Sequence, residues 1–117
     1  MIDLGVGSNF VTVGSGIDSV SVDDRNPSMD IWTTIAGFHA GDDATVLGIA
    51  PTDNIQWFDN QGAPGYSGLT FHDFSPNRPT ESLTLSGYST ADLSNGHLSV
   101  QFASQADGTP FLHIIAT

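Results

Sequence analysis

The chain has 117 residues, and its 13 acidic residues outweigh two arginines to give a formal net charge of -11. This length predicts a single domain with a buried core, and a hydrophobic content of 38% argues against disorder. Because phosphate groups are bound by clustered Lys and Arg, the charge excludes nucleic acid as a partner and disfavours anionic membranes. The sequence has neither cysteine nor a run of about 18 apolar residues, so it predicts no disulfide, no thiolate metal site and no membrane span.

Two glycine-rich units follow each other near the start of the chain, at residues 4–12 (LGVGSNFVT) and 13–21 (VGSGIDSVS). Aligned at a spacing of nine residues, they match at four positions: Gly5 with Gly14, Gly7 with Gly16, Asn9 with Asp18, and Val11 with Val20. Each unit predicts a glycine turn, where the backbone can adopt positive φ, followed by a short strand with an inward apolar residue.

The repeat resembles the RTX nonapeptide of secreted bacterial proteins, G-G-x-G-x-D-x-U-x, in which U is a large apolar residue. The second unit keeps both later glycines and the aspartate, whereas Leu4 and Val13 replace the first glycine of each unit and Asn9 replaces the first aspartate. Residues 35–47 (IAGFHAGDDATVL) are similar to the segment that commonly follows such repeats. The resemblance implies a calcium-binding parallel β-roll and its C-terminal repeat and capping region.

The rest of the chain predicts short strands separated by turns. Apolar alternation or short apolar runs predict strands at residues 11–13, 20–22, 29–35, 45–49, 54–59, 69–71, 83–85, 98–102 and 111–115. Residues 89–96 predict the only helix, with Ser89 or Thr90 as its N-cap and Gly96 as its stop. Asp107 and Gly108 predict a hairpin that pairs the last two strands antiparallel.

The predicted fold class is all-β, in one domain over residues 1–117. A short parallel β-roll at the N-terminus, over residues 1–49, should continue into an antiparallel or mixed β-sandwich-like sheet with at most one short helix. Residues 50–117 would then form a β cap that includes the C-terminal strands.

Calcium is the ligand that the acidic residues favour, because 12 of the 13 are aspartate, the short carboxylate of turns and calcium loops. In a roll with two nonapeptides per coil, turns on one edge are about 18 residues apart and an ion bridges two stacked turns. The turn at residues 5–9 should then stack on residues 23–27, and the turn at 14–18 should face 32–36 unless the coil widens. The predicted ligands are Asn9, Asp18, Asp23, Asp24, Asp42 and Asp43, with Asx turns or a solvated acidic surface as the alternative role of the same residues.

An enzymatic function is not expected. The four histidines His39, His72, His97 and His113 lack the tight spacing of a zinc site, and no G-x-S-x-G nucleophile motif occurs. We therefore expect a calcium-binding structural module of a secreted RTX-like protein, which folds on calcium binding outside the cell and caps the β-roll.

The alternative is an extracellular adhesion or carbohydrate-binding β-module that uses exposed aromatic residues. Four aromatic residues could stack on sugar rings: Trp32, Trp57, Tyr66 and Tyr88. We expect Trp57 to lie in the core and Tyr66, beside a glycine, to be exposed. The expected partners are calcium ions, a cell-surface or extracellular glycan, and a second copy that associates through the open edge of the roll.

The end of the chain bears on localisation. Residues 107–117 are similar to the acidic-then-apolar tails that direct RTX proteins through type I secretion, and this similarity implies a secreted bacterial protein. A closing β-strand accounts for the same alternation equally well.

Overall fold

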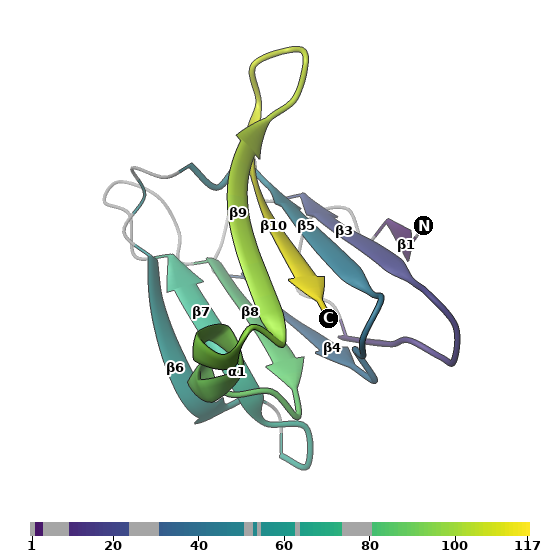
Figure 1. Cartoon of the computed structure of the whole chain (residues 1–117). Helices are drawn as coiled ribbons and strands as arrows, with labels where there is room; N and C mark the ends of the chain where they lie inside the picture. Colours follow the sequence, from purple (N-terminus) through teal and green to yellow (C-terminus); the bar gives the residue numbers. More distant parts are fainter. Residues whose placement is uncertain are drawn as a thin grey trace.

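The structure is a computed structural model that describes residues 2–3, 10–23, 31–50, 53, 55–62, 64–73 and 81–117. Two five-stranded sheets pack face to face, and one short helix lies at their side (Figure 1). The all-β fold class is therefore confirmed. No helix in the described ranges is long and apolar enough to cross a bilayer.

Each sheet combines strands from both halves of the chain. Sheet A contains, in spatial order, β1 (Ile2–Asp3), β3 (Ser19–Asp23), β5 (Asp43–Leu47), β10 (Pro110–Ala116) and β9 (Leu98–Ser104). Sheet B contains β2 (Phe10–Thr12), β4 (Ile31–Ala36), β8 (Glu81–Ser86), β7 (Gly68–Asp73) and β6 (Ile55–Gln61). The helix α1 (Thr90–Asn95) connects β8 in sheet B to β9 in sheet A.

The first five strands alternate between the two sheets, so the chain winds back and forth across the sandwich. As a result β1, β3 and β5 pair in parallel in sheet A, and β2 pairs in parallel with β4 in sheet B. The later strands mostly run antiparallel, except that β8 is parallel to β4. The mixed sheets agree with the predicted fold class, and the assignment of the parallel part to an RTX β-roll stays a prediction.

The pairing register shows how many residues each winding uses. Ile2 pairs with Val20, the offset of 18 residues that two nonapeptides would give. Phe10 pairs with Thr34 and Ser19 with Asp43, so the next offsets are 24 residues in both sheets. The expectation that the turn at 14–18 faces residues 32–36 is therefore wrong, because the chain uses six more residues between β3 and β4.

The core lies between the sheets and follows the period-two alternation of the strands. Sheet A contributes Val20, Val22, Ala44, Val46, Leu112 and Ile114, and sheet B contributes Ile35, Leu69, Phe71, Leu83 and Leu85. All of these side chains are at most 2% exposed. The strands β7 and β8 are also buried on the face that points away from sheet A.

The helix has the predicted boundaries. Ser89 is its N-cap, and the backbone N–H of Ser89 donates to Asp92 Oδ2 at 2.9 Å. Gly96 ends it in the left-handed conformation at φ 87°, which favours glycine. The hydrogen bond from Ser89 lowers the pKa of Asp92 below its usual value, and His97 adds to this effect.

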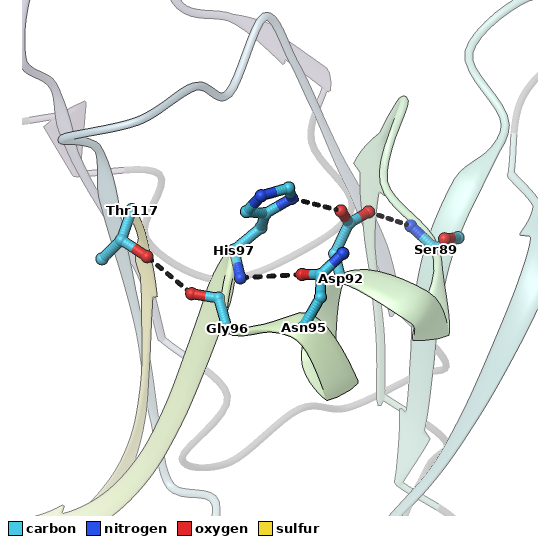
Figure 2. Close-up of polar contacts among 6 residues, drawn as sticks. All are labelled: Ser89, Asp92, Asn95, Gly96, His97 and Thr117. Carbon is cyan, nitrogen blue, oxygen red and sulfur yellow. Dashed lines mark hydrogen bonds and ion pairs between the residues drawn. The ribbon is translucent and has the colours of Figure 1, made fainter.

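The polar contacts around α1 fasten it to its surroundings (Figure 2). His97 Nδ1 lies 3.2 Å from Asp92 Oδ1, and Thr117 Oγ1 donates to the carbonyl of Gly96 at 2.6 Å. From sheet B, the carboxylate of Asp59 accepts hydrogen bonds from both the N–H and the hydroxyl of Thr90. These contacts explain how a helix of only six residues keeps its position beside the edge strands β9 and β6.

Candidate functional site

The glycine turn at residues 14–18, here called the first turn, stacks on the turn at residues 37–42, here called the second turn. The N–H of Val13 donates to the carbonyl of Ala36 at 2.9 Å, and the N–H of Asp18 donates to Asp42 Oδ1 at 2.8 Å. The second contact keeps the offset of 24 residues, so the stacking is a continuation of the parallel ladders. The wider coil thus brings Asp42, one of the predicted ligands, to the first turn.

Asp42 is the central contact between the two turns. Its side chain is fully buried, with Oδ1 accepting from Asp18 N and Oδ2 accepting from His39 N at 3.0 Å. The backbone of the second turn is also bonded to β10, because Gly41 N donates to Ala116 O and Ala116 N donates to Asp42 O, both at 2.9 Å. Asp42 therefore joins the first turn, the second turn and the C-terminal strand.

Asp43 makes a comparable connection one residue further on. Its Oδ1 accepts from the hydroxyl of Ser19 at 2.5 Å, and its Oδ2 lies 2.8 Å from His113 Nε2. The carboxylate thus connects β3, β5 and β10 across sheet A. Calcium ligation by Asp42 and Asp43 stays a prediction, and an ion there would share oxygens that already accept hydrogen bonds.

Asp18 has a different environment from these two aspartates. Its Oδ2 atom is buried and has no hydrogen-bond partner, although Asp18 N is satisfied by Asp42. A buried carboxylate oxygen without a donor is costly, so this atom fits a role as cation ligand. Calcium would find further oxygens in the carbonyls of the glycine turn.

The remaining predicted ligands contribute less to the site. Asp23 is half-buried at the end of β3, and Asn9 and Asp24 lie outside the described residues. Within the described ranges, no group of three or more histidine, aspartate and glutamate side chains is arranged to hold a metal. A calcium site built here would therefore depend on Asp18 and backbone carbonyls, or on segments beyond those ranges.

The imidazole of His39 lies over the stacked turns. Its Nδ1 is 2.9 Å from the carbonyl of Gly37 and 2.9 Å from Asp42 Oδ2, while 40% of the side chain remains exposed. The hydrogen bond to Gly37 raises the pKa of His39, with further contributions from the Gly16 backbone and the negative charges of Asp42 and Asp18. A protonated His39 thus supplies positive charge at the place where the two acidic turns meet.

We expect His39 and His72 to titrate in a defined order in an NMR pH titration. The pKa of His39 should lie above 6.5, so its stabilising charge is present below pH 6.5 and is lost as the pH rises through the folded-state pKa. Burial lowers the pKa of His72, because the charged imidazole is disfavoured there. The contribution of neutral His72 to the free energy of unfolding is therefore fully present above pH 6.5 and is lost as the pH falls through the folded-state pKa. A His39 signal that titrates below that of His72 would contradict the described contacts.

The four candidate aromatic residues divide into two groups. Trp57 packs edge-on against Phe71 at 5.5 Å between ring centroids, and Tyr88 packs against Phe38 at 6.0 Å, so both are partly buried against the core. Trp32 and Tyr66, in contrast, are 39% and 45% exposed. Tyr66 is exposed as expected, and Trp57 is half-buried and packs against the core.

Comparisons with known proteins add no family assignment. The sequence matches no family model and no curated protein, and no solved structure matches the chain. The contacts of the described residues therefore carry the functional inference.

Proposed function

We propose that the chain is a calcium-responsive, non-enzymatic structural module of a secreted RTX-like bacterial protein. The buried, unpartnered Oδ2 of Asp18, within two stacked glycine turns, is the observation that carries this proposal. Calcium at this carboxylate would offset the desolvation cost of the buried Oδ2 atom and would rigidify the turn.

The charge of the whole chain supports coupling between calcium and folding. With a net charge of -11 and only two arginines, the chain repels itself when it is compact. Extracellular calcium modules bind with dissociation constants of about 0.1 to 1 mM, so calcium outside the cell would offset this repulsion. Before export, when calcium is scarce, the same chain would stay loosely folded.

The sheet order supports the role of a cap. At one edge of the sandwich, sheet A ends in β1 and sheet B ends in β2, and both strands pair in parallel with their neighbours. A preceding parallel coil would add to these two edges, and self-association would use the same edges when they stay open. At the other edge the sheets end in β9 and β6, which pair antiparallel with their neighbours.

The proposed export signal at residues 107–117 has a structural consequence. Most of this segment forms β10, which lies between β5 and β9 and buries Leu112 and Ile114 completely. A secretion apparatus would therefore read these residues only in the unfolded chain. This agrees with export before calcium-dependent folding.

Thermal unfolding in calcium and in a chelator tests the proposal. At a calcium concentration about 100 times the dissociation constant, binding should stabilise the fold by about 2.7 kcal/mol and raise the midpoint by several degrees. Asp18→Asn should abolish this gain, because it removes the charged carboxylate whose buried Oδ2 would hold the ion.

Asp107→Asn, in the exposed hairpin, is the matched control and should keep the full calcium response. Magnesium in place of calcium controls for ionic strength. The proposal is wrong if calcium leaves the wild-type midpoint unchanged, or if Asp18→Asn responds to calcium as the wild type does.

A further inference from the structure

The face of sheet B that points away from sheet A is not an ordinary solvated surface. The alternation that places Ile35, Leu85 and Phe71 in the core places Thr34, Thr84 and Thr70 on this outer face. Yet these three threonines are at most 5% exposed. Groups other than sheet A cover them: the Trp32 ring contacts Thr84, and the segment after β6 lies against Thr70 and Thr84.

The buried polar groups of the outer face form a saturated network. Trp32 Nε1 donates to Thr84 Oγ1 at 2.8 Å, and Thr84 Oγ1 lies 2.6 Å from Thr70 Oγ1. Beside them, His72 Nδ1 lies 2.5 Å from Ser82 Oγ, and His72 Nε2 lies 2.6 Å from Gln61 Oε1. The network fixes the orientation of the Trp32 ring, which also meets the His72 ring edge-on at 5.0 Å.

Aromatic rings lie above this network and remain accessible. Phe10 is 51% exposed and meets Tyr66 edge-on at 4.8 Å, and Trp32 is 39% exposed. Of the five large hydrophobic side chains that are exposed in the described part of the chain, three are therefore on this side of sheet B. The segment after β6 folds over the sheet, because a Cβ at Gly62 would lie 2.9 Å from Thr84 Cγ2.

The charge of this face narrows the class of ligand. Along β2, β4, β8, β7 and the described part of the loop at 61–67, the residues on the outer side include no aspartate, glutamate or arginine. The remaining strand of the sheet, β6, carries the exposed Asp59, whose carboxylate is bonded to Thr90 of α1. These described residues therefore offer no arginine that could pair with an anionic ligand and no free carboxylate that could pair with a cationic one. Exposed rings with the Tyr66 phenol and the half-buried Gln61 amide beside them suit a neutral molecule with apolar ring faces and hydroxylated edges.

We propose that the outer face of sheet B binds a neutral glycan, whose pyranose rings stack on Trp32 and Tyr66. The saturated network beneath Trp32 holds the ring in place before the ligand arrives, which reduces the entropy lost on binding. This site is separate from the stacked glycine turns and does not depend on calcium. It would attach the module to a polysaccharide surface while the turns serve folding.

Isothermal titration calorimetry against a panel of neutral oligosaccharides (β-glucan, xylan, mannan and chitin fragments) tests the proposal. At least one neutral glycan should bind and should protect the fluorescence of Trp32 from quenching by acrylamide. In Trp32→Phe the only remaining tryptophan is Trp57, which packs against the core, so the glycan should no longer change the quenching. Trp32→Ala and Tyr66→Ala should each weaken binding at least tenfold. Phe102→Ala removes an exposed ring from β9 of sheet A, 41% exposed in the wild type, and should leave the affinity unchanged.

Two further measurements distinguish this site from the calcium site and from nonspecific adsorption. Binding should be equal in calcium and in chelator, so failure of the calcium proposal would leave it intact. Thr84→Val removes the acceptor for Trp32 Nε1 and should weaken binding several-fold without unfolding the protein. The proposal is overturned if no neutral glycan binds, if only sulfated or sialylated glycans bind, or if neither Trp32→Ala nor Tyr66→Ala weakens binding in a variant that remains folded.

Discussion

Replacing Gly37 with alanine is expected to lower the free energy of unfolding by about 2 to 5 kcal/mol, a decrease in the midpoint of about 8 to 20 °C. Two physical terms add up in this variant. Gly37 has φ +83°, where an L residue costs about 1 to 2 kcal/mol. In addition, the new Cβ would overlap the carbonyl oxygen of Val13, which forces the two stacked turns apart.

Gly65→Ala is the matched control for this prediction. Gly65 has nearly the same conformation, φ +82°, but a Cβ there meets no atom within 4 Å. The control should therefore show only the conformational cost, about 1 to 2 kcal/mol. Equal losses for the two variants, measured by thermal or urea unfolding, would mean that the first turn does not lie on Gly37.

Replacing Asp42 with alanine is expected to cost about 3 to 5 kcal/mol. The substitution leaves the N–H groups of Asp18 and His39 without their acceptor in a site where Asp42 is fully buried. Asp42→Asn keeps one carbonyl oxygen and should recover about half of the loss. Urea unfolding in the presence of chelator measures both variants without a contribution from calcium.

Asp107→Ala provides the comparison for an exposed aspartate. Asp107 Oδ1 also accepts a backbone hydrogen bond, from Thr109 N at 2.9 Å, but in an exposed hairpin where water can replace it. We expect a loss below about 1 kcal/mol. If Asp42→Ala is as mild as Asp107→Ala, the buried carboxylate does not hold the two turns together.

The elements that the sequence predicts well are those decided by neighbouring residues. Strands such as β9 and β10 follow from simple alternation, and their antiparallel pairing follows from Asp107 and Gly108. The ends of α1 follow from Ser89 and Gly96, because capping depends on residues within one turn of the helix. In each case the deciding contact is local, so the residue types are sufficient.

The offset of 24 residues shows what local patterns leave open. The nonapeptide spacing correctly gives the offset of 18 between β1 and β3, but the next winding depends on how much chain lies between β3 and β4. No periodic pattern in the sequence shows that the segment between β3 and β4 is longer and changes the pairing offset. For this reason Asp42, and not a residue at 32–36, meets Asp18.

The burial of the outer face of sheet B cannot be predicted from the sequence for a similar reason. Thr70 and Thr84 each lie between two apolar residues, a pattern typical of a strand with one solvent-facing side. Their burial requires a loop from the far edge of the sheet to fold over them, together with Phe10 from the opposite edge. Contacts between the two edge strands of a sheet depend on the complete topology.

The parallel pairing of β4 with β8 also has a kinetic consequence. It pairs Ile31 with Glu81, and the pairing of β5 with β10 places Leu47 beside Phe111. The central strands of each sheet are therefore far apart in the sequence, and they can pair only after the long segment between them has folded back. High contact order of this kind places folding in the range of milliseconds to seconds. The newly made chain would therefore remain uncompacted for a comparatively long time. Under the export route proposed above, a translocation machine could engage it in that interval without first having to unfold it.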